Sequence, residues 1–201
     1  YRAALSYELS VVKWPNTPIK SYSSDWNSVV KTIYDYDDFG LELNKTGYFE
    51  DDIKAVLAGK NTPEEKIVTL LSYVKSRVKW DEYESYTCDK GVKKAYQEKV
   101  GNCAEINLML TAMLRYAGLT ANPVLVSTRS NGIPLFPNRT AFNYVIAAVE
   151  TPNGNVLLDA TDKFSTPNIL PLRTLNWNGP LIRKDGSSEQ YPWRTLPNWK
   201  C

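Results

Sequence analysis

The sequence predicts an α+β fold with a central helix packed on an antiparallel sheet. Helical patterns occupy the first part of the 201-residue chain, and a helix with apolar residues on several sides begins at Cys103. Strand patterns follow this helix, and two of them are joined by an Asn-Gly pair, a strong signal for a β-hairpin. Helices and strands that occur in separate runs, rather than in strict alternation, are typical of the α+β class.

The first elements are marked by alternation and by capping residues. Residues 3–11 alternate between apolar and polar side chains, the period of a half-buried strand, and Trp14-Pro15 ends this pattern. Ser24-Asp25 provides N-cap residues for a helix with apolar side chains at positions 26, 29, 30 and 33. A second helix is expected over 49–58, ending at Gly59.

The next helices have clearer boundaries. Thr62-Pro63-Glu64-Glu65 combines a capping box with proline at the first helical position, and it opens a helix whose apolar stripe runs to Val78. Residues 83–90 are predicted to be irregular, and 92–100 to form a short amphipathic segment. The central helix should end at Gly118, because glycine commonly terminates helices.

Three strands are predicted after the central helix, over 123–128, 143–149 and 156–159. The loop over 130–140 separates the first two and contains two prolines, while Asn153-Gly154 joins the last two as a hairpin. From Lys163 onward the chain is rich in Pro, Asn, Trp and Gly. This composition predicts an extended strap without regular secondary structure.

Composition excludes several classes of function. The chain contains no histidine, which rules out Ser-His-Asp and Cys-His-Asp relays and the HExxH zinc helix. A net charge of +2 without long basic runs argues against a nucleic-acid partner, and no apolar run is long enough for a transmembrane segment. Three cysteines without a CxxC pair indicate no metal site, and no motif indicates a cofactor.

Cys103 has the position of a nucleophile. At a helix start, unpaired N–H groups and the positive end of the helix dipole favour a thiolate and can hold an oxyanion during acyl transfer. The other interpretation is a small buried side chain, which is the ordinary role of an unpaired cysteine.

Five segments together resemble a transglutaminase-like core, which has a cysteine-proteinase-like fold. The segments are Gly101 to Glu105, Leu114 to Leu119, Ala121 to Val126, 142–150 and 157–162. More narrowly, the segments resemble bacterial proteins in which a β-rich domain of unknown function precedes such a core and another β domain follows it. The resemblance implies a remnant strand of a preceding β-rich domain over 1–20, the core over 21–175 and an extended C-terminal segment over 176–201. It also implies a periplasmic or cell-surface location in a Gram-negative bacterium.

The resemblance implies catalytic residues in the chain order Cys, His, Asp. Cys103 matches the nucleophile and Asp159 the residue that orients the histidine, but Tyr144 occupies the histidine position. Tyrosine has an ordinary pKa near about 10 and is a poor proton acceptor at neutral pH, so roughly 10²- to 10⁴-fold of general-base catalysis should be lost. We therefore expect a catalytically degenerate site. A simpler interpretation of Tyr144 is that it fills the vacated space in a strand.

Two residues are candidates for substrate binding. Trp80 follows the helix expected near the cysteine, and Asn143 precedes Tyr144 and could hydrogen-bond near Cys103. The preferred hypothesis is a non-catalytic domain that binds a peptide or protein, or that has a structural role. One alternative is an active cysteine peptidase or acyltransferase whose base is altered or supplied from outside. A third is an architectural domain between neighbouring β-rich domains of the same polypeptide.

Overall fold

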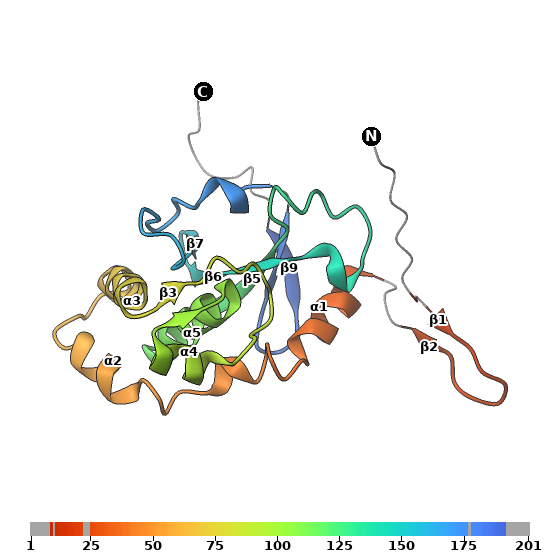
Figure 1. Ribbon diagram of the computed structural model, residues 1–201, viewed down its shortest axis with the longest axis horizontal. Coiled ribbons are helices and arrows are strands. Elements are labelled where there is room, and N and C mark those ends of the chain that lie inside the picture. Colours follow the sequence, from red (N-terminus) through yellow and green to blue (C-terminus); the bar gives the residue numbers. More distant parts are fainter. Residues whose placement is uncertain (1–8, 10, 22–24, 177, 192–201) are drawn as a thin grey trace, which may run out of the picture.

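A five-stranded sheet forms the centre of the computed structural model, which describes residues 9, 11–21, 25–176 and 178–191 (Figure 1). The strand order is β7-β6-β5-β8-β9, and each neighbouring pair is antiparallel. The predicted α+β class with an antiparallel sheet is confirmed. The strands are β5 (Ala121–Val126), β6 (Tyr144–Thr151), β7 (Gly154–Leu158), β8 (Gly179–Ile182) and β9 (Ser188–Tyr191).

The helix that begins at the cysteine is the central one. Helix α5 (Cys103–Tyr116) packs on β5 and β6, and all of its residues from Cys103 to Leu114 are buried. Helices α3 (Pro63–Arg77) and α4 (Val92–Glu98) pack on α5, and α2 (Glu50–Val56) packs on α3. The predicted capping box of α3, from Thr62 to Glu65, is present.

Shorter elements connect these layers. Helix α1 (Trp26–Tyr34) is capped by Asp25, as predicted, and packs near β8. A two-residue parallel pair, β3 (Lys79–Trp80) with β4 (Val100–Gly101), places the end of α3 beside the start of α5. The described residues also form three 3₁₀ turns: η1 (Glu42–Asn44), η2 (Arg139–Ala141) and η3 (Leu172–Thr174).

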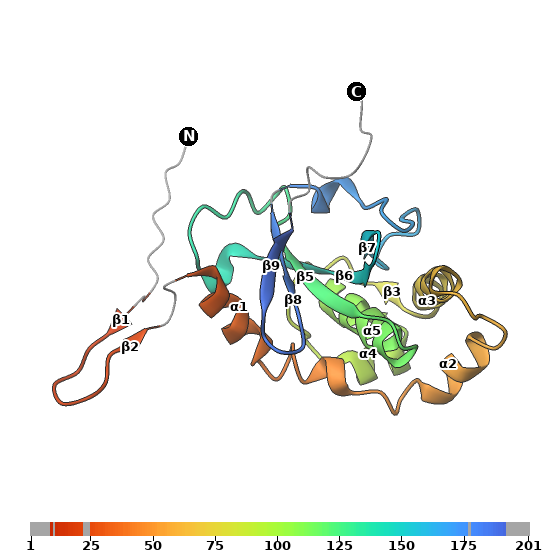
Figure 2. The same ribbon diagram turned by 180° about the vertical axis from the view of Figure 1, so that it is seen from behind.

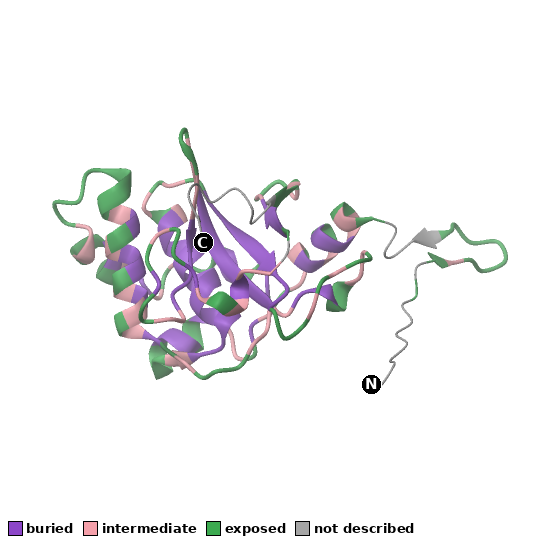
Figure 3. Cartoon of the chain, turned by 90° about the horizontal axis from the view of Figure 1, so that it is seen from above, coloured by how far each residue is buried: buried purple, intermediate pink, exposed green. Residues whose placement is uncertain are grey.

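Both faces of the central strands are buried, as the coloured cartoon shows (Figure 3). On one face, Leu125 and Val145 belong to the core formed with the helices. On the other, Val124 and Ile146 pack with Leu170 of the segment that follows β7. The strap after residue 163 therefore covers the second sheet face, which explains why β5 and β6 are almost continuously apolar.

The prediction that no regular structure follows residue 163 is wrong over 179–191. Strand β8 pairs with β5 through Val124 and Leu181, and β9 pairs with β8, so this hairpin extends the central sheet (Figure 2). The extended segment expected over 176–201 is therefore partly sheet. Asp185-Gly186 forms its turn, with Gly186 at φ 81°. The apolar residues of β8 are buried at the sheet, which outweighs the local abundance of Pro and Asn.

The N-terminal strand prediction lies mostly outside the described residues. The described part is a small hairpin of β1 (Val11–Val12) and β2 (Lys20–Ser21), which extends away from the sheet in Figure 1. Leu9 and Val11 were expected on a buried face, but they are 61% and 49% exposed. The described elements include no helix long and apolar enough to cross a bilayer.

Candidate functional site

The Cys103 thiol is enclosed by the loop that precedes α4. Its sulfur donates to the backbone oxygen of Ser85 at 2.8 Å and accepts from the backbone N–H of the same residue at 3.2 Å. The backbone N–H of Cys103 donates to the oxygen of Tyr83, and Asn102 donates from its side chain to Thr87. Cys103 is 0% exposed. The segment Tyr83 to Thr87, called here the covering loop, thus closes over the nucleophile position.

The residues around Cys103 build the start of α5. The Asn102 side chain accepts from the backbone N–H of Glu105, and the Glu105 carboxylate accepts from the backbone N–H of Asn102. Glu105 also accepts from the backbone N–H groups of Lys90 and Gly91, and it is fully buried. Asn102 and Glu105 therefore cap the helix and anchor the entry to α4, the roles that such residues ordinarily have at a helix start.

Gly101 is required by the same packing. A Cβ atom at this position would lie 2.8 Å from Oε2 of Glu105 and 3.0 Å from the Cβ of Ala95. Real Cβ atoms do not approach neighbours this closely without displacing them. The Gly-Asn-Cys-Ala-Glu motif is thus one packing unit that fixes where the thiol lies.

Tyr144 and Asp159 meet at the ends of two neighbouring strands. The Tyr144 hydroxyl donates to Oδ2 of Asp159 at 3.1 Å and lies 2.7 Å from Oγ1 of Thr161. The Asp159 carboxylate also accepts from the backbone N–H and the hydroxyl of Thr161. Both Tyr144 and Asp159 are 0% exposed. The hydroxyl therefore occupies a donor position toward the carboxylate.

Arg173 brings a positive charge to this network from the strap. One guanidinium nitrogen donates to Oγ1 of Thr161 at 2.8 Å and lies 4.0 Å from Oδ2 of Asp159. The guanidinium lies over the ring of Trp80, 4.5 Å from its centroid, and the Trp80 ring meets the Tyr144 ring edge to face. Trp80 is thus stacked between the site and the strap.

Asn107 and Asn143 hold the two sides of the site. Asn107, one turn after Cys103 on α5, donates to Asp159 and to the backbone oxygen of Val145, and accepts from the backbone N–H of Ala160. Asn143 donates to the carboxylate of Glu84, which belongs to the covering loop. Asn143 also exchanges hydrogen bonds with Thr128, so it secures the covering loop without contacting the sulfur.

Burial controls the protonation of the two key groups. Loss of solvation raises the pKa of the Cys103 thiol well above its ordinary value, and the nearby Asp159 acts in the same direction. Burial likewise raises the pKa of Tyr144, assisted by Asp159. Near neutral pH the site therefore contains a neutral thiol and a neutral phenol, and neither is an activated catalyst.

The structure brings together four of the five residues singled out from the sequence. Cys103, Tyr144 and Trp80 pack in one cluster, and Asp159 joins it through Tyr144. Asn143 instead donates a hydrogen bond to Glu84 of the covering loop.

Sequence reasoning missed Asn107 and Arg173. The position of Asn107, four residues after Cys103 on the same helix face, was an available signal, whereas nothing in the strap marked Arg173. Among the described residues, no group of acidic or cysteine side chains is arranged to hold a metal ion.

The comparisons with known proteins concern the family and the fold of the chain. The family model of the transglutaminase-like superfamily matches residues 51–160, a range that includes Cys103, Tyr144 and Asp159. A search of the curated proteins finds no match.

A search of the solved structures finds similar chains. A candidate protease from Parabacteroides distasonis is 13% identical, with a TM-score of 0.59, over 94% of this chain and 36% of that one. A candidate cysteine protease from Cytophaga hutchinsonii is 18% identical, with a TM-score of 0.41, over 75% of this chain and 47% of that one. A structure described as a TGase is 13% identical, with a TM-score of 0.43, over 65% of this chain and 34% of that one. The chain thus spans less than half of each of these structures.

Proposed function

Because the chain belongs to the transglutaminase-like superfamily, we propose that it is a member whose cysteine site has lost acyl-transfer chemistry and now has a structural role. The observation that carries this proposal is the hydrogen bond from Tyr144 to Asp159. The carboxylate that would orient a histidine instead receives a proton donor that cannot serve as a base at neutral pH.

Among the described residues, no basic group accepts a hydrogen bond from the thiol. The thiol donates to the backbone oxygen of Ser85, and a peptide oxygen is not basic enough to remove its proton. The Tyr144 hydroxyl is already engaged with Asp159 and Thr161, and burial holds its pKa above the ordinary tyrosine value. General acid-base catalysis worth about 10²- to 10⁴-fold is therefore missing from the acyl-transfer reaction.

The closed covering loop favours the structural role over ligand binding at the sulfur. Cys103, Tyr144 and Asp159 are each 0% exposed, so a peptide cannot reach the thiol while the covering loop stays in place. A peptide or protein partner of this domain would bind to another part of its surface. The hydrogen bonds of Asp159 instead join α5, the end of β7 and, through Tyr144, the start of β6.

An active enzyme with an altered base is the competing hypothesis. It would need the covering loop to open and the pKa of Tyr144 to fall far below its ordinary value. Both changes oppose the contacts of Asn143 with Glu84 and the burial of the phenol.

Activity measurements on the protein and its Cys103→Ala variant test the proposal. Both proteins are incubated with a mixed peptide library, and separately with a glutamine peptide and a primary amine, from pH 7 to pH 9. We expect neither cleavage nor amide exchange that depends on Cys103. Product that forms with the unchanged protein and disappears with Cys103→Ala would refute the structural role.

A second experiment tests whether position 144 is the lost base position. Tyr144→His supplies an imidazole beside Asp159, and Tyr144→Phe is the matched control because it keeps a ring without a base. We expect iodoacetamide to alkylate Cys103 faster in Tyr144→His than in Tyr144→Phe near pH 7, as measured by peptide mass mapping that separates Cys103 from Cys88. Equal rates in the two variants would contradict the assignment.

A further inference from the structure

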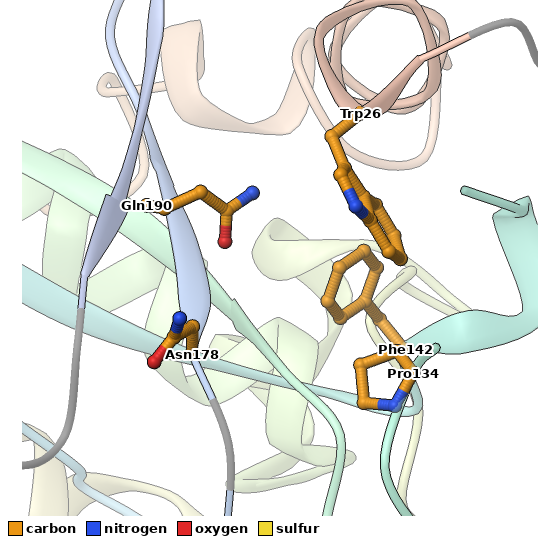
Figure 4. A pocket seen from close by; sticks show the side chains of 5 residues that line it. All are labelled: Trp26, Pro134, Phe142, Asn178 and Gln190. Atoms are coloured by element: carbon orange, nitrogen blue, oxygen red, sulfur yellow. The ribbon is translucent and has the colours of Figure 1, made fainter. Parts of the chain in front are cut away.

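A cavity of about 150 Å³ lies away from the cysteine, between α1, the loop before β6 and the β8–β9 hairpin (Figure 4). It is lined by Trp26, Pro134, Phe142, Asn178 and Gln190. None of these side chains contacts Cys103, Tyr144 or Asp159 among the described interactions. The cavity is therefore separate from the site described above.

One wall of this cavity is aromatic and firmly held. The rings of Trp26 and Phe142 lie with centroids 5.6 Å apart at an interplanar angle of 57°, and Phe142 is only 3% exposed. Pro134 lies next to Phe142 in Figure 4. Helix α1 is tied to β9 by a hydrogen bond of 2.8 Å from Ser188 to Asn27, the residue after Trp26. This wall is thus formed before any ligand binds.

The opposite side carries two neutral amides. Asn178 and Gln190 are exposed, and their side-chain amides form no hydrogen bond with another described residue. The amide of Gln190 points toward Trp26 in Figure 4. Each amide offers both donors and an acceptor. Among the residues that the structure describes, no charged side chain lines the cavity. The lining therefore matches a neutral ligand that has one apolar face and several hydroxyl groups.

We propose that this cavity binds one pyranose ring of a neutral sugar. The C–H face of such a ring packs on an aromatic wall, and its hydroxyls pair with the amides. A proline side chain would fill the wall but leave both amides without partners, and a charged side chain would have no counter-charge. A sugar satisfies the apolar and the polar parts of the lining together.

Titration with sugars, followed by NMR, tests this proposal. The probes are glucose, galactose and N-acetylglucosamine, each as the monosaccharide and as a β-linked disaccharide, with a triproline peptide as the competing class. The chain has six tryptophans, so its ¹H–¹⁵N spectrum has six indole signals, and that of Trp26 is assigned as the one lost in Trp26→Leu. We expect at least one sugar to shift this signal in a saturable way and the peptide to leave it unchanged.

Gln190→Leu is the decisive variant, because the side chain is exposed and its replacement should not affect folding. Loss of one hydrogen bond should raise the dissociation constant for the binding sugar by about three- to tenfold. Gln97→Leu, the same change at an exposed position on α4, is the matched control and should leave the constant unchanged. The proposal fails if no sugar shifts the Trp26 signal, if triproline alone shifts it, or if both variants bind the sugar as the unchanged protein does. The outcome does not depend on the chemistry of Cys103, so the two proposals can fail separately.

Discussion

Asp159 is the residue on which the polar contacts of the cysteine site converge. Its carboxylate is fully buried, accepts hydrogen bonds from Asn107, Tyr144 and Thr161, and has Arg173 at 4.0 Å. A buried carboxylate without donors and a counter-charge is strongly unfavourable. Tyr144 donates a hydrogen bond to this buried charge, and Arg173 places a positive charge near it.

Replacing Arg173 with methionine should expose this dependence. Methionine keeps much of the apolar contact with Trp80 but removes the guanidinium that faces Asp159. We expect the free energy of unfolding in urea to fall by about 1–3 kcal/mol, because the buried Asp159 loses its counter-charge while the Arg173 side chain is itself 26% exposed. Lys163→Met, which removes an exposed charge from the same segment, should change it by less than about 0.5 kcal/mol. The double variant Asp159→Asn/Arg173→Met tests whether the two residues stabilise each other. If its loss of unfolding free energy equals the sum of the losses in the two single variants, the residues are not coupled.

Stability should fall on the alkaline side. Burial raises the pKa of the Cys103 and Cys88 thiols in the folded chain, whereas both titrate near about 8.5 when unfolded. As pH rises through that value the unfolded chain loses thiol protons that the folded chain keeps, so the unfolding free energy decreases. Cys103→Ser removes one of these groups and should make the decrease between about pH 9 and 10 smaller by up to about 1.4 kcal/mol per pH unit. Urea unfolding across this range measures both slopes, and parallel slopes would show that the thiol is not protected from ionisation.

At the scale of single residues, the sequence was informative where motifs are local. Cys103, Tyr144 and Asp159 were identified by their places within short segments, and the structure brings them into one cluster with Trp80. Arg173 could not be predicted, because its contact with Asp159 depends on how the strap returns across the sheet. Asn143 was expected near Cys103, but its partner is Glu84, which lies on a loop whose path no sequence pattern defines.

Among the elements, the start of α5 is the most constrained. The buried Glu105 carboxylate joins the helix cap to the entry of α4, and Gly101 leaves the space that this carboxylate fills. The position of the Cys103 thiol therefore depends on the packing of Gly101 before it and of Glu105 after it.

Gly101→Ala tests this constraint. The new methyl would lie within 3.0 Å of Glu105 and Ala95, so either the carboxylate or α4 must move. We expect a loss of about 1–3 kcal/mol in unfolding free energy, the usual cost of overpacking, together with faster alkylation of Cys103 as the cap loosens. Gly47→Ala is the matched control, because a Cβ there meets nothing within 4 Å. If the two variants are equally stable, the Glu105 carboxylate can move away from the new methyl without a loss of unfolding free energy.

The elements also show where sequence prediction failed. Helices α1, α3 and α5 begin at residues with capping signals, and the structure confirms these starts. Strands β8 and β9 were missed because Asn, Pro and Trp around them indicated a loop. Their formation depends on the free edge of β5, which lies more than fifty residues earlier in the chain, and the Asp185-Gly186 turn was the one local signal that could have revealed them.

At the scale of the whole molecule, the two ends of the described chain contribute unequally to the fold. The β1–β2 hairpin extends away from the sheet with Leu9 and Val11 exposed, whereas β8 places Leu181 and Ile182 in the interior at 1% and 0% exposure.

A chain that starts at residue 25 should therefore keep the urea midpoint of the full chain. A chain that stops at Asn176 lacks the edge pairing of β5 and the burial of two large apolar side chains, each worth roughly 1.5–3 kcal/mol, and should unfold at a much lower midpoint or not fold at all. Circular dichroism and urea titration of the two truncated chains measure this difference. If the chain that stops at Asn176 has the same urea midpoint as the full chain, then the stable core ends near residue 175 and β8 and β9 do not contribute to its stability.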